Sequence, residues 1–486
     1  MLVGIDVGTT GTKTVLFDGS KVVASHYVEY NIESPKNGYA EQNPEWWWKS
    51  AKEGLKKLSK YGKEIDAIGI SGQMHGVTII NREGQPVSNS IIWADQRSIR
   101  ECEELKERFG KEIKNPITPT FSLPQLMWIK REKERIFKKV YKFLLPKDYV
   151  KYKLTDSITT DPSDASGTLM YDVEKLKWNY EIIEELDIPT AILPEVFSSS
   201  SIVGEVKKEV ARECGLKANI PVCSGGADQA CGAIGAGIFE EGRISSVIGT
   251  AGVILSHSDK PIYDEKKRVF TFAHILEKQW FIMGVMQSAG LSLKWLRERF
   301  LSNKADAYGF LDNIASRQPL GAENTIFLPY LFGERTPYWD PHLRGAIVGI
   351  SYKTSIGTIA RAIMEGVVFG LYESLKIIEE MGIKVKDVVA LGGGAKSRLW
   401  RKIMADIFFR DVLSPTLKEC TSFGASLLAG LSVDTFSDIS DIIKIIGYEE
   451  KISPDITVHN RYMRYYELYK KTSQSLKEIF HEMSKL

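Results

Sequence analysis

LVGIDVGTTGTKTVLFD, residues 2–18, consists of two β-rich runs joined by the glycine-threonine run GTTG at residues 8–11. Because glycine weakens a strand, this run predicts a hairpin turn. Glycines let backbone N–H groups approach an anion closely, and the hydroxyls of Thr9 and Thr10 add further donors. The turn is therefore typical of a phosphate cradle.

Asp6 lies two residues before this turn, inside an apolar strand. A carboxylate cannot bind phosphate directly, because like charges repel. It can hold a hydrated Mg²⁺ that bridges to the phosphates, and this is the role we predict for Asp6. The alternative is an ordinary glycine turn next to a solvated aspartate.

ISSVIGTAGVILSH, residues 244–257, repeats the strand, turn, strand pattern around Gly249 and Thr250. Strands and helices alternate through the rest of the chain, which indicates an α/β protein. We therefore predict two duplicated α/β lobes whose turns face a nucleotide across a cleft. The expected domains are 1–240, with the sugar site and the first phosphate turn, and 241–486, with the adenine nucleotide site. A hinge is expected near residues 235–242.

Composition narrows the class of protein. A chain of 486 residues is too long for one hydrophobic core, and a net charge of +2 argues against a nucleic-acid binder. No apolar run reaches the roughly 18 residues that span a bilayer, and the first residues do not resemble a secretory signal. Five cysteines without C-x-x-C spacing, and histidines without zinc spacing, indicate reduced thiols and no protein-held zinc. We expect a cytoplasmic protein.

LGGGAKSRLW, residues 391–400, places a glycine loop between a strand and a helix. It lacks the spacing of a P-loop, because Ala395 precedes Lys396. Because the glycines leave the backbone open, an adenine or a ribose could lie flat against this loop. The alternative is that the loop is only a tight turn.

GGADQACG, residues 225–232, places Asp228 at the expected N-cap of a helix. Capping alone explains an aspartate there. The functional interpretation is a general base, because a helix N-terminus favours the ionised carboxylate and keeps the base available at neutral pH.

SGQMHGV, residues 71–77, ends a strand with Gln73, Met74 and His75 between glycines. An amide, a thioether and an imidazole at a strand end could form a small polyol pocket. His75 could equally be a satisfied structural histidine.

WADQRS, residues 93–98, has Trp93, Asp95 and Arg97 at alternating positions, which share one face of an extended segment. Sugars bind well to an aromatic wall with flanking polar groups. The alternative is an ion pair over a core tryptophan.

Taken in order, GIDVGTTGTK, SGQMHG, WADQRS, LLPKDYVKYKLT, SDASGT, GGADQACGA, IGTAGV, FLPYLFGERTP and LGGGAKSRLWRKIMADI resemble the FGGY carbohydrate kinases from end to end. That resemblance implies the two-lobed actin/hexokinase-type fold, which is ribonuclease H-like. Within the family, QMHG, SDASGT and GERTP look most like the segments of xylulokinases.

The resemblance also implies residue roles. Asp228 would be the catalytic base, and Asp6 would lie near Mg²⁺ and the transferring phosphate. The sugar would contact Gln73, Met74, His75, Trp93, Asp95, Arg97, Asp228 and Gln229, and ATP would contact Thr9, Thr10, Gly11, Lys13, Gly249, Thr250, Gly290, Gly394, Ala395 and Arg398. One departure stands out, since many xylulokinases have Asn after the catalytic Asp. Gln229 is a pairing associated with glycerol kinases, and it makes a shifted sugar preference possible.

The activity implied is ATP-dependent, Mg²⁺-assisted phosphorylation of D-xylulose to D-xylulose 5-phosphate, with a homodimer possible and no nucleic-acid or membrane partner. The rival within the family is a kinase for ribulose, gluconate or glycerol. The rival from another class is a non-enzymatic nucleotide switch of the actin or chaperone type. Such proteins need a client-binding domain or a polymer surface, and this chain ends soon after its last α/β elements.

Overall fold

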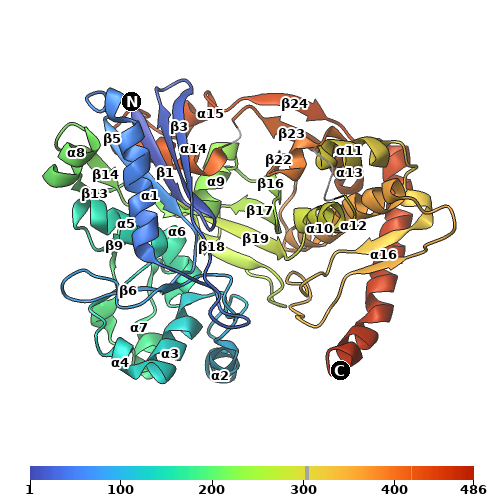
Figure 1. The fold of residues 1–486 in the computed structure, drawn as a ribbon, viewed down its shortest axis with the longest axis horizontal. Coiled ribbons are helices and arrows are strands. Elements are labelled where there is room, and N and C mark those ends of the chain that lie inside the picture. Colours follow the sequence, from blue (N-terminus) through green and yellow to red (C-terminus); the bar gives the residue numbers. More distant parts are fainter. Residues whose placement is uncertain (302–305, 418) are drawn as a thin grey trace.

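The computed structural model describes residues 1–301, 306–417 and 419–486. Within them the chain forms two lobes, each built around a seven-stranded mixed sheet (Figure 1). The sheet of the N-terminal lobe runs in the order β13-β14-β5-β1-β2-β3, with β15 also paired to β5. The sheet of the C-terminal lobe runs β18-β19-β17-β16-β22-β23-β24. The predicted two-lobed α/β fold is confirmed.

The N-terminal lobe contains the first half of the elements. Its main sheet consists of β1 (Leu2–Val7), β2 (Gly11–Phe17), β3 (Val22–Glu29), β5 (Ala67–Gly72), β13 (Ile202–Glu205), β14 (Pro221–Cys223) and β15 (Gly226–Ala227). Its helices are α1 (Pro44–Lys57), α2 (Ile99–Phe109), α3 (Ser122–Glu132), α4 (Glu134–Phe137), α5 (Pro146–Thr155), α6 (Pro162–Ala165), α7 (Tyr180–Glu185), α8 (Lys208–Cys214) and α9 (Asp228–Ala236). Short two-stranded ribbons complete it: β4 (Glu41–Gln42) with β7 (Ser90–Ile91), β6 (Thr78–Ile80) with β8 (Lys142–Leu144), β9 (Thr159–Thr160) with β12 (Glu195–Val196), and β10 (Tyr171–Asp172) with β11 (Lys177–Trp178).

The second half of the chain supplies the C-terminal lobe and two helices that leave it. The sheet consists of β16 (Arg243–Ile248), β17 (Gly252–Ser258), β18 (Phe270–Ala273), β19 (Trp280–Met286), β22 (Asp387–Leu391), β23 (Asp411–Pro415) and β24 (Tyr448–Ile452), with a separate ribbon of β20 (Ile326–Leu328) and β21 (Ala346–Val348). The helices are α10 (Gly290–Phe300), α11 (Ala307–Ser316), α12 (Ile356–Glu380), α13 (Arg398–Phe408), α14 (Cys420–Ser432), α15 (Ile439–Ile443) and α16 (Ile456–Met483).

The two lobes repeat one topology. In the first, β1 is antiparallel to β2 and parallel to β5, which is in turn parallel to β14. In the second, β16 is antiparallel to β17 and parallel to β22, which is parallel to β23. The glycine-threonine turns at residues 8–10 and 249–251 therefore occupy equivalent places, as the sequence repeat predicts.

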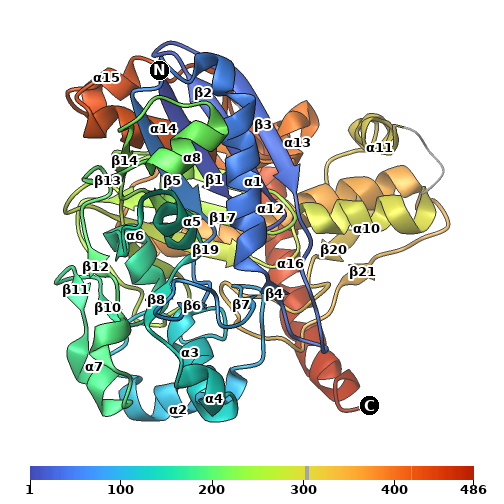
Figure 2. The same ribbon diagram turned by 60° about the vertical axis from the view of Figure 1, so that its left-hand side comes forward.

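Helix α14 belongs to the second half of the sequence but packs on the first sheet. Figures 1 and 2 both show it beside β1 and β5, and its Phe423 lies 5.1 Å from Phe17 of β2, ring centroid to ring centroid. A Cβ at Gly4 or at Gly69 would overlap a carbonyl oxygen of α14. These two glycines let the helix backbone lie directly on the strands. The chain thus crosses between the lobes again after the predicted hinge.

Local sequence explains where the helices begin. The side chain of Asn43 caps α1 by accepting from the N–H of Glu45 at 3.0 Å, and Pro44 is the first helical residue. Its Trp47 is fully buried. At the start of α12, Ser355 and Thr358 form a capping box. In the described ranges, no helix has both the length and the apolar character that crossing a membrane requires.

Candidate active site

Asp6 and Asp228 lie on either side of one strand. In the register of the sheet, Asp6 of β1 pairs with Ser71 of β5, and Ala227 of β15 pairs with Gly72 of the same strand. All three strands are parallel, so the residues that follow them meet at one edge of the sheet. With strands about 4.8 Å apart and a rise of about 3.3 Å per residue, the Cα atoms of the two aspartates are roughly 12 Å apart across β5. The structure therefore brings together the two carboxylates predicted from distant parts of the sequence.

The carboxyl group of Asp6 is strongly destabilised in its ionised form. Burial, reinforced by the negative charges of Asp228 and Glu419, raises the pKa of Asp6 to about 8. Its Oδ1 is buried and accepts no hydrogen bond from the described residues. A cation bound next to this buried, unpaired oxygen would stabilise the ionised form of Asp6.

Asp228 differs from its predicted role in two respects. It is the first residue of α9 and not its N-cap, which is Ala227, and its Oδ1 accepts from the N–H of Gln229 at 2.7 Å. The pKa of Asp228 is raised by burial to about 7, although hydrogen bonds from Gln229 lower it. The hydrogen bonds at the start of the helix favour the ionised carboxylate, as predicted, but burial outweighs them and the net shift of the pKa is upward.

The first turn leaves backbone donors available. The N–H of Gly8 bonds to the carbonyl of Gly11 at 3.1 Å and closes the turn. The N–H groups of Thr9 and Thr10 donate no hydrogen bond within the part of the chain that the structure describes. Nearby, Lys13 forms an ion pair with Glu419 at 3.1 Å.

Met74 and His75 follow the end of β5 and are buried against the SDASGT segment, residues 163–168. His75 has a positive φ of 73°, and its Nδ1 donates to the carbonyl of Gly167 at 2.6 Å. Nε2 is therefore an acceptor, and burial lowers the pKa of His75 to about 4, so the ring is neutral. A Cβ at Gly167 would come within 3.0 Å of this ring and 3.1 Å of the methyl group of Met74. Glycine at 167 makes room for both side chains.

Gln73 takes part in an internal network. Its Nε2 donates to Oε1 of Gln42 at 2.8 Å, and this oxygen also accepts from the indole N–H of Trp47. The Oε1 of Gln73 is buried without a partner among the described residues. It is the one polar atom of this side chain that remains for a ligand.

Asp95 and Arg97 are committed to each other. The guanidinium of Arg97 contacts both oxygens of Asp95 and pairs with Glu41 at 2.7 Å, and it stacks on Tyr39 at 3.8 Å. This matches the alternative interpretation of an ion pair over aromatic rings, although the tryptophan beneath it is Trp128 and not Trp93. This geometry leaves neither side chain with a free polar group that could bind a sugar.

Trp93 is placed differently. Its indole N–H donates to Oγ1 of Thr9 at 2.8 Å, which links it to the first turn. On its ring lies the guanidinium of Arg335, 5.4 Å from the centroid. Trp93 therefore joins the first turn to a residue of the other lobe.

A cavity of about 560 Å³ lies in the C-terminal lobe, between the second turn, α10, α11, α12 and the glycine loop. Of the predicted ATP contacts, Gly249, Thr250, Gly290 and Gly394 line it. The N–H of Gly290 is already bonded to the carbonyl of Gly249 at 2.8 Å, so this glycine contributes surface and no donor. A cavity of this size accommodates a nucleoside.

The four predicted ATP contacts of the first turn and β2 lie in the other lobe, and two of those in the C-terminal lobe also lie outside the lining of this cavity. Ala395 is in the glycine loop but almost fully buried. Arg398 is largely exposed, and its Nε donates to Glu450 at 2.9 Å. The geometry gives neither side chain a contact with the cavity.

Sequence reasoning missed several lining residues of the cavity: Lys294, Tyr308, Asp312, Met364, Lys396, Ser397 and Trp400. Most lie on α10–α13, where helical periodicity predicts packing and gives no indication of a ligand.

Sequence reasoning also assigned no role to Arg335 of the GERTP segment. Burial lowers the pKa of Arg335 to about 10, and its positive charge lowers that of His75. Across the described ranges, no carboxylate lies within 4.0 Å of its guanidinium. The neighbouring Glu334 is turned elsewhere, accepting from the N–H groups of Gln287 and Arg335. Arg335 is thus a partly buried cation that makes no ion pair among the described residues, although the charge of Glu334 acts on it, and it lies next to His75 and Trp93.

Comparison with known proteins agrees with this geometry. The model of the N-terminal domain of the FGGY family of carbohydrate kinases matches residues 1–235, and that of the C-terminal domain matches residues 244–433. The xylulose kinase of Staphylococcus xylosus is 37% identical over 478 residues, covering 96% of this chain and 99% of the relative. The xylulose kinase of Bacillus subtilis is 36% identical over 488 residues (98% and 97%), and the gluconokinase of that species 33% over 462 residues (91% and 90%).

Solved structures give the same result. The ligand-bound xylulose kinase of Lactobacillus acidophilus superposes with a TM-score of 0.93 at 28% identity, over 99% of both chains. The gluconate kinase of that species gives the same values. Family membership also sets aside the rival interpretation as a non-enzymatic nucleotide switch. The chain belongs to the FGGY family of carbohydrate kinases and is an ATP-dependent sugar kinase.

Proposed function

We propose that this kinase transfers the terminal phosphoryl group of ATP to D-xylulose and forms D-xylulose 5-phosphate. The observation that carries the proposal is the similarity to proteins named xylulose kinase at up to 37% identity over nearly the whole chain. The arrangement of Asp228, Met74 and His75 around the end of β5 supports it, because it offers a base, an apolar contact and a neutral acceptor to one small polyol.

Asp228 is the general base in this proposal. A pKa of about 7 means that a substantial fraction is ionised at neutral pH, and that this carboxylate holds a proton more strongly than an ordinary aspartate. Phosphoryl transfer has a loose transition state, so Asp228 accepts the hydroxyl proton as the new P–O bond forms. Such assistance typically contributes about 10²–10⁴-fold in rate.

Asp6 fits the role of holding Mg²⁺ through water. Its Oδ1 has no hydrogen-bond partner among the described residues and its pKa is raised, so a bound cation would stabilise its ionised form. The described residues contain no group of three or more His, Cys, Asp or Glu arranged to hold a metal. In this proposal Asp6 is the carboxylate that would hold the hydrated ion against the phosphates. When bound, Mg²⁺ neutralises charge on the phosphates. The free N–H groups of Thr9 and Thr10 donate to the same phosphates.

The nucleoside end of ATP occupies the cavity lined by Gly249, Thr250, Gly290 and Gly394. The boundary at residues 240/241 divides the sugar-binding domain from the nucleotide-binding domain, and residues 235–242 act as the hinge. The unpaired guanidinium of Arg335 donates to sugar hydroxyls or to phosphate oxygens. The enzyme works in the cytoplasm, and a homodimer remains a prediction.

A panel of acceptors tests the proposal. Purified enzyme with ATP and Mg²⁺ is given D-xylulose, D-ribulose, D-gluconate or glycerol, and ADP release and the phosphorylated product are both measured. We expect kcat/KM to be highest for D-xylulose. A higher kcat/KM for another acceptor would show that D-xylulose is not the preferred substrate, while the proposed phosphoryl transfer from ATP would still stand. Gluconate is the strongest competitor, because of the similarity to the gluconokinase of Bacillus subtilis.

A further inference from the structure

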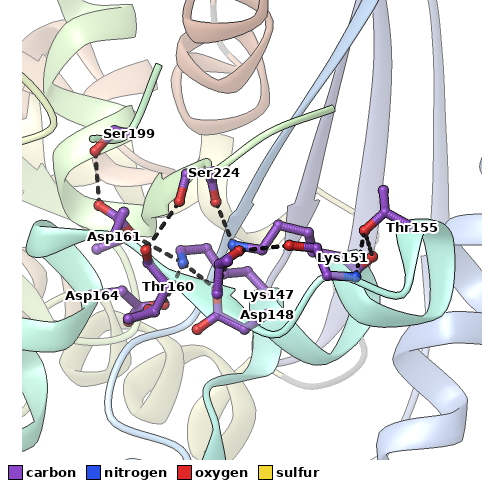
Figure 3. Close-up of polar contacts among 12 residues, drawn as sticks. Lys147, Asp148, Lys151, Thr155, Thr160, Asp161, Asp164, Ser199 and Ser224 are labelled. Atoms are coloured by element: carbon purple, nitrogen blue, oxygen red, sulfur yellow. Dashed lines mark hydrogen bonds and ion pairs between the residues drawn. The ribbon is translucent and has the colours of Figure 1, made fainter. Parts of the chain in front are cut away.

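Five ionisable side chains lie together in the N-terminal lobe, fully buried, beneath the turn that leads to Asp228 (Figure 3). They are Lys147, Asp148 and Lys151 of α5, Asp161, and Asp164 of α6. Asp148 pairs with Lys147 at 2.6 Å and with Lys151 at 3.0 Å, and Lys147 pairs with Asp161 at 2.9 Å and lies 3.4 Å from Asp164. We call this group the buried charge cluster.

The cluster is an unfavourable way to stabilise a core. Moving a charge out of water has an effective penalty of several kcal/mol per ion, and apolar side chains of similar volume often stabilise a fold as well or better. Both oxygens of Asp164 also lack a hydrogen-bond partner in the described part of the chain. The presence of the buried charge cluster is therefore better explained by the segment that it holds in place.

What it holds is the turn from Ser224 to Ala227. The Nζ of Lys151 donates to the carbonyl of Ser224 at 2.8 Å (Figure 3). At the other end, the N–H of Ala227 donates to Oγ of Ser163 at 2.9 Å, and that hydroxyl donates to Asp161 at 2.5 Å. The cluster thus contacts one end of the turn directly, through Lys151, and the other end through Ser163, and the next residue is Asp228.

The turn needs such support. Gly225 within it has a φ of 82°, and a Cβ there would overlap the carbonyl oxygen of Ile70, so the turn lies tightly on β5. The strand that follows, β15, has two residues, which pair with Ser71 and Gly72. The N–H groups of Ser224 and Gly225 anchor the start of the turn on the carbonyls of Ser201 and Ser199. Its end, next to Asp228, is held by these two strand pairs and by Ser163, and a catalytic base must be placed to within about an ångström.

We propose that the buried charge cluster, acting through Ser163, positions the carboxylate of Asp228 for proton transfer. Ser163 is then a positioning residue and touches neither substrate nor ATP. The inference rests on the proposed role of Asp228 as general base.

Two serines allow a matched test. Ser163 and Ser199 both donate to the same oxygen of Asp161, at 2.5 and 2.8 Å, and both are fully buried. Only the hydroxyl of Ser163 also accepts from the N–H of Ala227. Ser163→Ala and Ser199→Ala each remove one buried hydroxyl from Asp161, but Ser163→Ala also leaves the N–H of Ala227 without its acceptor and should be the more destabilising. Rates are therefore compared at a temperature where both variants are fully folded. We expect kcat to fall about tenfold or more in Ser163→Ala and less than about threefold in Ser199→Ala, with the KM for ATP unchanged in both.

A double-mutant cycle shows whether Ser163 acts through Asp228. In the background of Asp228→Asn, adding Ser163→Ala should change the residual kcat by less than about twofold, since the carboxylate that it positions is already absent. A full additional loss there, or equal losses in the two serine variants, would overturn the inference. Near-normal turnover of Asp228→Asn alone would instead overturn the role of Asp228 in the proposed function, so the two failures are distinguishable.

Discussion

Asp228 is subject to two opposing effects on its carboxylate. Hydrogen bonds from Gln229 at the start of α9 stabilise the charge, while burial destabilises it and prevails, so the pKa rises to about 7. The balance suits a base that works at neutral pH, because the group is partly ionised and yet binds a proton firmly.

Asp228→Asn should lower kcat by at least roughly 10²-fold, because the amide cannot accept the proton. The change keeps the size of the side chain, so folding and nucleotide binding should be retained. Steady-state kinetics with D-xylulose, together with titration by a nucleotide analogue, measures both. Turnover close to that of the native enzyme would exclude Asp228 as the base.

The raised pKa predicts a dependence on pH with a definite sign. Below about pH 7, protonation removes the base, so kcat/KM should fall about tenfold for each pH unit. Mg²⁺ must be kept saturating, because a bound cation keeps Asp6 ionised and removes its own titration from the profile. A rate that stays constant from pH 7 to pH 5.5 would contradict the assignment.

His75→Ala should raise the KM for the sugar by roughly tenfold while the KM for ATP changes little, because Nε2 is an acceptor for a hydroxyl in this proposal. Since burial lowers the pKa of His75 to about 4, this contact should be independent of pH between 6 and 8. Initial rates over a matrix of sugar and ATP concentrations give both constants. Equal increases in the two would indicate a structural histidine.

Single residues differed in how predictable their surroundings were. Asp6, Met74, His75 and Asp228 stand at strand ends beside glycines, a local pattern that is visible in one sequence. The pair of Asp95 and Arg97 shows the limit of such patterns, because Glu41 and Tyr39, which complete their interactions, lie more than 50 residues away in the chain. Spacing alone could not separate an ion pair from a sugar contact.

At the scale of elements, α9 and α14 approach each other through glycines. A Cβ at Gly424 of α14 would overlap the carbonyl oxygen of Cys231 of α9, and a Cβ at Gly235 would overlap that of Cys420. The two helices follow equivalent strands in the two halves of the chain, so this contact is nearly symmetric.

Gly424→Ala should destabilise the protein by about 1–3 kcal/mol, because the added methyl forces the helices apart. Gly232→Ala is the matched control. It lies in α9 facing α14, but a Cβ there meets only the hydroxyl of Thr421, at 3.3 Å. Both variants gain similar helix propensity, so the difference between their thermal midpoints isolates the close contact. Equal midpoints would show that the helices are not held so tightly.

Most elements could be predicted from the sequence, since alternating strands and helices and the repeated glycine-threonine turn are local patterns. The crossing of α14 onto β1 and β5 could not. It depends on contacts between residues far apart in the chain, such as that between Gly4 and the carbonyl of Ser422, which are more than 400 residues apart. In the sequence, Gly4 and Gly69 look like ordinary strand residues.

At the scale of the whole molecule, the first turn belongs to one lobe and the cavity of about 560 Å³ to the other. In the proposed function a single ATP reaches both, so we expect the lobes to close about residues 235–242 when nucleotide and sugar are bound together. Small-angle scattering with a non-hydrolysable ATP analogue and D-xylulose should show a smaller radius of gyration than the free enzyme. Unchanged scattering would mean that the lobes are already closed without ligands.

The position of α14 also affects how the protein is made. One face of β1 and β5 stays uncovered until residue 432 has left the ribosome, although the last strand of that sheet ends at Ala227. At about 5–20 residues per second, this interval is roughly 10–40 s. During it the nascent first half exposes an apolar sheet, and chaperones that recognise such surfaces are expected to bind it until synthesis supplies the missing helix.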